Sequence, residues 1–129
     1  MRNAIILHGT GDKNTDFWFP YIKEKLEEKG FEVWLPQLPN AEKPNIKDWL
    51  WFVLENGKFT TETIIIGHSS GSQLILSILE IIKIQIKQAV LVSGYAESLR
   101  ENYDSEKKSE LDWEKIKQNV QDITFINSD

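Results

Sequence analysis

The fold is decided by the stretch Ile64-Ile65-Ile66-Gly67-His68-Ser69-Ser70-Gly71-Ser72. It runs from a β-branched apolar segment through the pattern G-x-S-x-G into residues 74–82, which are apolar nearly all round and predict a central helix. This order of strand, sharp turn and helix is typical of a nucleophile elbow, whose strained turn needs almost no side chain two residues before and after the serine. Only Ser69 has glycines at both positions, so the pattern predicts Ser69 as a nucleophile. The alternative is a serine that merely caps the helix.

Five short apolar runs predict buried strands at residues 4–7, 31–35, 63–66, 89–92 and 123–126. Between them, apolar residues at helical spacing predict helices that begin near Phe19, Ile46, Leu74 and Trp113, the last continuing to Val120. Because strand and helix alternate, we expect a three-layer α/β fold with a parallel sheet, right-handed crossovers and strand order 2-1-3-4-5. The first helix then covers one face of the sheet, and the other three cover the opposite face.

Length and composition predict one domain over residues 1–129. The chain is 40% hydrophobic and 27% charged with a net charge of -5, which is too apolar for a disordered protein. It has no cysteine, which excludes disulfides, thiolate metal sites and a cysteine nucleophile and fits a reducing compartment. Only His8, His68 and carboxylates could bind a metal, and we expect no cofactor.

Charge and hydropathy also limit the partners. The chain has no basic run that would bind nucleic acid, and its apolar N-terminal segment is too short for a signal peptide or a membrane span. We therefore expect a cytoplasmic protein with neither a nucleic-acid nor a membrane partner.

A second glycine-containing turn, Leu7-His8-Gly9-Thr10-Gly11, follows the first predicted strand. In a nucleophile-elbow fold this turn lies beside the elbow, so we predict an oxyanion hole formed by the backbone N–H groups of Thr10 and Ser70. His8 is expected to orient this loop and to border the substrate pocket. The alternative is a phosphate-cradling loop, but Asn14 stands where G-x-G-x-x-G has its third glycine.

Two further segments have two alternative interpretations each. The aromatic residues Phe17, Trp18 and Phe19 are expected either to line an acyl pocket, with Trp18 as the candidate, or to belong to the core. Residues 97–110 are crowded with charge and predict a solvated surface or a lid.

Several parts of the chain resemble one family, the small α/β-fold serine hydrolases typified by the retinoblastoma-binding protein nine hydrolase and its bacterial YdeN-like relatives. The matching parts are the His8-Gly9 turn, residues 17–20 (FWFP), 36–40 (PQLPN), 64–71 (IIIGHSSG), 90–95 (VLVSGY), 112–116 (DWEKI) and the terminal Ser128-Asp129. The elbow is common to many hydrolases, whereas the tryptophans and prolines together are more specific to this family. The resemblance implies a Rossmann-like sheet of the minimal α/β-hydrolase kind, with Ser69 as the nucleophile.

The resemblance also implies a catalytic acid and a catalytic histidine after the last predicted strand. Asp129 matches the start of the family's acidic stretch and is the candidate acid, while no histidine follows Ser69. We therefore expect this chain to lack the family's C-terminal strand and helix and to be inactive or weakly active alone. Strands three to five would then expose apolar surface, so we expect a homodimer through this face or a polypeptide that continues beyond Asp129.

Together these patterns predict a serine hydrolase that cleaves a small ester or amide substrate through an acyl-enzyme on Ser69. The alternative is a non-catalytic module that uses the same scaffold to bind a protein partner. Backbone strain around Ser69 would favour the enzyme, because such strain is hard to explain without chemistry.

Overall fold

The computed structural model describes residues 2–94, 100 and 111–127, and it contains a five-stranded parallel sheet with the order β2-β1-β3-β4-β5. The strands are β1 (Asn3–Leu7), β2 (Glu32–Trp34), β3 (Ile64–His68), β4 (Ile86–Ser93) and β5 (Val120–Asn127). The helices are α1 (Phe19–Glu28), α2 (Ile46–Asn56), α3 (Ser70–Ile81) and α5 (Trp113–Gln118). The predicted fold class and strand order are confirmed.

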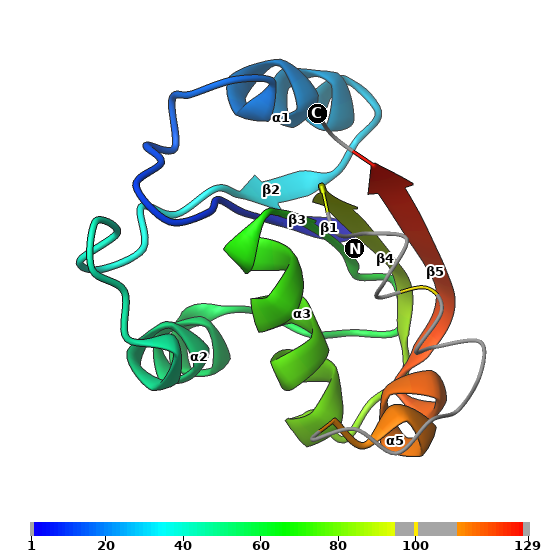
Figure 1. Ribbon diagram of the computed structural model, residues 1–129. Coiled ribbons are helices and arrows are strands. Elements are labelled where there is room, and N and C mark those ends of the chain that lie inside the picture. The colour runs from blue at the N-terminus through cyan, green and yellow to red at the C-terminus, as the bar shows by residue number, and fades with distance from the viewer. Residues whose placement is uncertain (1, 95–99, 101–110, 128–129) are drawn as a thin grey trace.

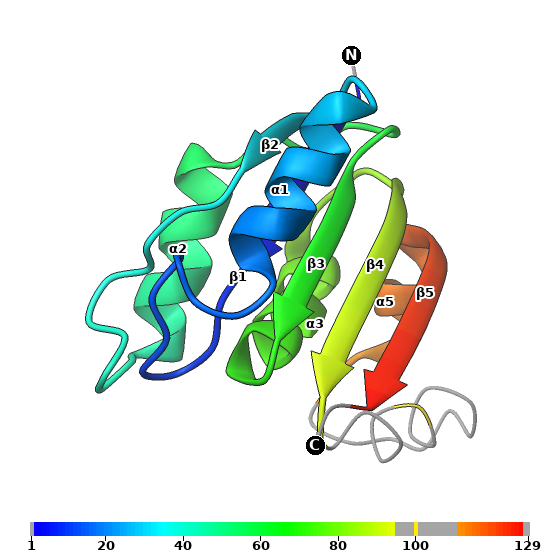
Figure 2. The same ribbon diagram turned by 90° about the horizontal axis from the view of Figure 1, so that it is seen from above.

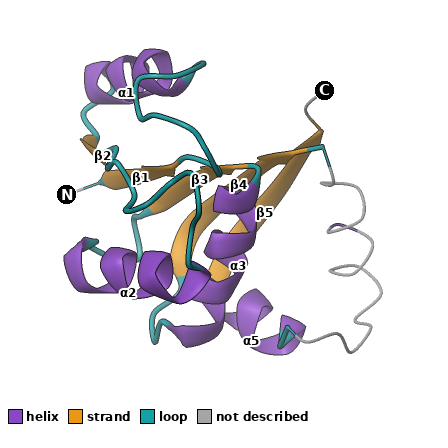
Figure 3. Ribbon diagram, turned by 60° about the vertical axis from the view of Figure 1, so that its left-hand side comes forward, coloured by secondary structure: helices purple, strands orange, loops and turns teal. Residues whose placement is uncertain are grey.

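The helices form two layers around the sheet. Figure 1 shows α1 on one face and α2, α3 and α5 on the opposite face, and Figure 3 shows the same layers from the side. The largest core lies between the sheet and the three-helix layer, where α3 packs against β3, β4, α2 and α5. Seven of the twelve residues of α3 are buried, which explains why its sequence is apolar nearly all round.

Local signals in the sequence explain where the helices begin and end. Pro20 lies in the first turn of α1, where its missing N–H costs no hydrogen bond, and Gly30 follows the helix with a φ of +89°. The Asn45 side chain accepts hydrogen bonds from the Lys47 and Asp48 N–H groups and so caps α2. Gly57 is the residue that ends this helix.

The predicted extent of the last helix is wrong, because Val120 belongs to β5 and pairs with Ile86. Helix α5 ends at Gln118, and the following Asn119 donates its side-chain amide to the carbonyls of Leu79 and Ile82. These two bonds fix the turn from α5 into β5. Val120 is nevertheless buried, and its apolar side chain packs into the core from β5 rather than from the helix.

One face of the sheet is only partly covered. Figure 2 shows that α1 lies over the part of the sheet near β1 and β2, and no other described helix lies over β4 and β5 on that side. The β-branched residues that alternate with the buried core positions are here only half-buried or exposed: Ile64, Ile66, Val90, Val92 and Ile126. The described residues therefore present the apolar surface that the sequence predicts.

Candidate active site

Ser69 lies at the carboxyl end of β3, on the turn that leads into α3, with a φ of 56° and a ψ of -121°. Non-glycine residues rarely adopt a positive φ, and such strain persists only where the surrounding structure imposes it. A Cβ on Gly67 would lie 2.6 Å from the Gly71 carbonyl oxygen, and a Cβ on Gly71 would lie 2.5 Å from the Leu7 carbonyl oxygen. The two glycines are therefore required by close backbone packing, as the elbow pattern predicts.

Helix capping does not explain Ser69. Its side chain makes no capping hydrogen bond to α3, although Ser69 occupies the N-cap position. The hydroxyl that ties this turn together belongs to Ser72, which donates to the Gly67 carbonyl at 3.0 Å. The Ser69 N–H donates to the Val92 carbonyl at 2.8 Å, which holds the elbow against β4. The geometry is that of a nucleophile elbow rather than of an ordinary capped helix.

The loop after β1 packs directly against the elbow. A Cβ on Gly9 would lie 3.0 Å from the Ser69 Cβ and 2.9 Å from the His68 carbonyl oxygen, so only a glycine fits there. The next residue, Thr10, donates its backbone N–H to Ser70 Oγ at 2.8 Å, and the two hydroxyl oxygens are also 2.8 Å apart. The structure thus brings together the two residues predicted to form the oxyanion hole.

His8 is completely buried and holds two loops together. Its Nε2 accepts the Leu38 N–H at 2.8 Å, and its Nδ1 lies 2.9 Å from the Gly9 carbonyl oxygen. The ring meets Trp49 edge-on, with centroids 5.6 Å apart. This placement fits the predicted orienting role, whereas a ring with no exposed surface has no way to contact a substrate in this conformation.

His68 points away from β3 into a polar and aromatic environment. Its Nδ1 lies 3.1 Å from Asp12 Oδ2, and the rings of Phe17, Phe19 and Trp18 lie 5.2, 5.8 and 6.0 Å from the His68 ring. Asp12 is a site residue that the sequence reasoning missed. The available signal was an aspartate three residues after a glycine, from where a carboxylate can reach back to a backbone N–H.

The three consecutive aromatic residues have different surroundings. Phe19 is fully buried and belongs to the core, while Phe17 is 65% exposed and has a φ of 51°. Trp18 is half-buried at the N-cap of α1, with its ring packed edge-on against Phe19 and His68. Phe19 is therefore a core residue, and the role of Trp18 in a substrate pocket stays a prediction.

The turn at Ser69, the predicted oxyanion loop (residues 9–10) and the aromatic residues 17–19 thus lie together at the carboxyl ends of β1 and β3. The strand order reverses between these two strands. Open α/β sheets bind their ligands at this position. The sequence profile of the serine hydrolase family matches residues 4–127 of the chain. The chain belongs to this family.

Two curated relatives agree with this assignment. The chain is 33% identical over 101 residues to the putative hydrolase YdeN of Bacillus subtilis (strain 168) and 31% identical over 133 residues to the serine hydrolase RBBP9 of Rattus norvegicus. The alignments cover 76% and 97% of this chain. They cover 53% and 69% of the two relatives, so the chain spans about half the length of YdeN.

Solved structures show the same fold. The crystal structure of the ydeN gene product from B. subtilis matches with a TM-score of 0.78 and 27% identity, covering 95% of this chain and 69% of that chain. An extracellular alpha/beta-hydrolase from a Paenibacillus species matches with a TM-score of 0.55 and 17% identity, covering 82% of this chain and 52% of that one. The second match concerns the fold alone.

The structure does not describe two of the predicted elements of the site. Asp129, the candidate acid, lies outside the described residues, as does the charged segment 97–110 apart from Arg100. Among the described residues, no group of three His, Cys, Asp or Glu side chains could hold a metal ion. Among the described contacts, His8 bonds to Leu38 and Gly9, His68 bonds through Nδ1 to Asp12, and neither ring is shown bonded to Ser69.

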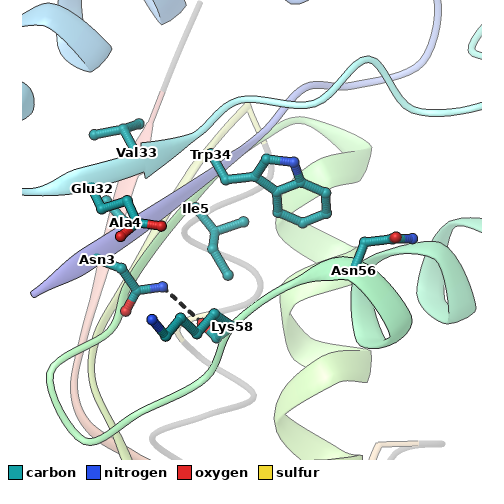
Figure 4. A pocket seen from close by; sticks show the side chains of 8 residues that line it. All are labelled: Asn3, Ala4, Ile5, Glu32, Val33, Trp34, Asn56 and Lys58. Atoms are coloured by element: carbon teal, nitrogen blue, oxygen red, sulfur yellow. Dashed lines mark hydrogen bonds between the residues drawn. The ribbon is translucent and has the colours of Figure 1, made fainter. Parts of the chain in front are cut away.

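A cavity of about 190 Å³ lies beside β1 and β2, and none of its lining residues belongs to the elbow or to the loop after β1. Figure 4 shows Trp34 and Ile5 on its walls and Glu32 and Lys58 near its edge. The Asn3 amide inside it already donates to the Lys58 carbonyl at 2.8 Å. The cavity is smaller than the usual small-molecule pocket of several hundred Å³, and we assign it no part in the candidate site.

Proposed function

We propose that the protein hydrolyses a small ester or amide through an acyl-enzyme on Ser69. The observation that carries this proposal is the strained backbone of Ser69 between two glycines that the packing requires. A backbone strained in this way costs about 1–3 kcal/mol, which an ordinary turn would avoid. The strain presents the serine hydroxyl at the end of the sheet where a substrate carbonyl can approach.

The proposed reaction begins with attack of Ser69 Oγ on the substrate carbonyl carbon while its proton passes to a general base. The carbonyl oxygen becomes an oxyanion, and collapse of this intermediate expels the alcohol or amine, which takes up the proton. Water then hydrolyses the acyl-enzyme by the same steps. His8 Nε2 accepts the Leu38 N–H, and neither histidine is shown in contact with Ser69, so no described residue is assigned as the base, and Asp129 stays the candidate for the acid that orients it.

The backbone N–H groups of Ser70 and Thr10 are proposed to stabilise the oxyanion. Ser70 is the first residue of α3, where N–H groups lack carbonyl partners within the helix and the helix dipole favours negative charge. Thr10 is held beside it by the close packing of Gly9 against Ser69. Trp18 is proposed to border the acyl group of the substrate.

A fluorophosphonate probe tests this proposal directly, because it labels only an activated serine. The product of the complete reading frame should be labelled on Ser69, as located by peptide mass spectrometry. The Ser69→Ala variant should not be labelled, whereas Ser77→Ala, a control on the same helix, should react like the wild type. A folded wild-type protein that stays unlabelled would overturn the enzyme proposal and favour a binding module.

We also propose a cytoplasmic location and a homodimer. The absence of cysteine from the sequence supports a reducing compartment. No helix in the described part of the chain is long and apolar enough to cross a membrane. The half-covered face of β3, β4 and β5 supports association of two copies through apolar side chains.

A further inference from the structure

One carboxylate oxygen joins the oxyanion loop to the elbow. Asp12 Oδ2 accepts the Gly9 backbone N–H at 2.8 Å and lies 3.1 Å from His68 Nδ1. The two side chains are largely shielded from water, with exposed fractions of 13% for Asp12 and 19% for His68. Because Gly9 precedes Thr10 and His68 precedes Ser69, this oxygen connects the neighbours of a predicted oxyanion donor and of the nucleophile.

The connection lies close to the reacting atoms. A Cβ on Gly9 would lie 3.0 Å from both Asp12 Oδ2 and the Ser69 Cβ, so these two atoms are no farther apart than twice that distance. An ionised carboxylate this near would repel the negative charge that develops on the substrate oxygen. A hydrogen bond from His68 reduces that repulsion, since it draws the carboxylate's charge toward the imidazole.

His68 is held in place for this bond by the aromatic side chains around it. The rings of Phe17, Trp18 and Phe19 are all within 6.0 Å of its centroid. Among the described residues, Asp12 is the one titratable side chain shown in contact with His68. The imidazole is therefore fixed by packing and bonded to a single charged partner.

We propose that Asp12 and His68 form a positioning pair. Asp12 fixes the oxyanion loop on the elbow, and His68 offsets the negative charge that the Asp12 carboxylate brings close to the oxyanion site. The inference rests on the proposed hydrolase function. Neither residue is placed on the substrate, and both act through Gly9 and the electrostatic potential at the oxyanion site.

Kinetics of the complete polypeptide on a p-nitrophenyl ester test the pair through four variants. His68→Phe keeps a ring in the aromatic surroundings but removes the donor, and it should lower kcat about 10-fold with KM changed less than about 2-fold. His68→Asn keeps an N–H near the Nδ1 position and should stay within about 3-fold of wild type. Adding Asp12→Asn to His68→Phe should restore kcat to within about 3-fold of Asp12→Asn alone, because the unpaired charge is gone.

This rescue separates the proposal from a merely structural role. If the pair only stabilised the fold, the double variant would be at least as impaired as His68→Phe, and that result would overturn the proposal. Thermal unfolding of each variant shows that the proteins compared are folded at the assay temperature.

A second readout does not depend on catalysis. The Gly9 amide resonance in a ¹H–¹⁵N spectrum should move in both Asp12→Asn and His68→Phe, while the amides of α2 stay in place as an internal control. An unmoved Gly9 resonance in His68→Phe would overturn the pair. If the wild-type protein is not labelled by a fluorophosphonate but Gly9 responds, the positioning contact stands and the hydrolase proposal fails.

Discussion

The Thr10 backbone N–H donates to Ser70 Oγ at 2.8 Å, so a predicted oxyanion donor is bonded to the side chain of the other donor's residue. Ser70 Oγ also lies 2.8 Å from Thr10 Oγ1. A substrate oxyanion that accepts from the Thr10 N–H must displace this hydroxyl, which requires rotation of the Ser70 side chain. Without substrate, the Ser70 hydroxyl therefore occupies the position on the Thr10 N–H that the substrate oxyanion would take during the reaction.

Removing that acceptor should make Ser69 more reactive. In Ser70→Ala the Thr10 N–H no longer exchanges an internal bond for the oxyanion, and a hydrogen bond of this kind is worth about 0.5–1.5 kcal/mol. We therefore expect fluorophosphonate labelling of Ser69 to be about 2- to 10-fold faster than in wild type. Ser77→Ala on the same helix is the control. A slower reaction would show that the Ser70 hydroxyl itself supports the oxyanion.

Substitution of the elbow glycine Gly71 should cost much more stability than substitution of the loop glycine Gly11. Gly71→Ala places a Cβ 2.5 Å from the Leu7 carbonyl oxygen and 2.7 Å from the His8 carbonyl oxygen, and both are backbone atoms that cannot turn aside. We expect a loss of about 3 kcal/mol in the free energy of unfolding. Gly11→Ala is the matched control, because its φ is +76° but nothing lies within 4 Å of the added Cβ. It should cost about 1 kcal/mol, from backbone strain alone. If urea titrations gave the same loss in the free energy of unfolding for Gly71→Ala and Gly11→Ala, this explanation would be contradicted.

His8 should matter for stability and not as a base. His8→Phe keeps a ring beside Trp49 but leaves the buried Leu38 N–H without its acceptor, which should cost about 2 kcal/mol. The melting temperature should fall, while fluorophosphonate labelling below that temperature should continue. Lost labelling with an unchanged melting temperature would instead identify His8 as the base.

The elbow and the strand order could be predicted because both depend on local signals. Gly67 and Gly71 lie two residues from Ser69 in the sequence, and the short β-branched runs alternate with helical spacing along the whole chain. The Asp12–His68 contact could not be predicted in the same way, since it joins residues 56 positions apart and depends on how two loops meet. The same is true of the Thr10–Ser70 contact, at a separation of 60.

The boundary error at Val120 has a different cause. Apolar residues at 113, 116 and 120 fit one helical stripe, but Asn119 bonds to two carbonyls at the end of α3 and turns the chain there. A side-chain bond to a distant segment outweighs helical spacing in so short a helix.

Self-association should depend on the open face of the sheet. Ile126 is 44% exposed on that face and pairs in register with Val92 of β4. Ile126→Lys should shift a dimer toward the monomer, because two copies would bring like charges and unsatisfied polar groups into an apolar contact. Light scattering after size exclusion measures the mass. Trp51→Lys, at a 58% exposed position on α2, is the control and should leave the mass unchanged. If both variants keep the wild-type mass, association does not use this face.

The backbone strain at Ser69 should lower the free energy of unfolding, and glycine at this position should recover part of that loss. At a φ of 56° and a ψ of -121°, glycine has no Cβ to collide with the backbone, whereas alanine has the same Cβ as serine. Strain of about 1–3 kcal/mol is relieved by glycine and is offset in part by about 0.5–1 kcal/mol of extra chain entropy in the unfolded state. Ser69→Gly should therefore be about 1 kcal/mol more stable to urea than Ser69→Ala, although neither reacts with a fluorophosphonate. Because both variants lack the hydroxyl, the comparison isolates the backbone. A Ser69→Gly protein less stable than Ser69→Ala would mean that the elbow is relaxed, and the main support for catalysis at Ser69 would be lost.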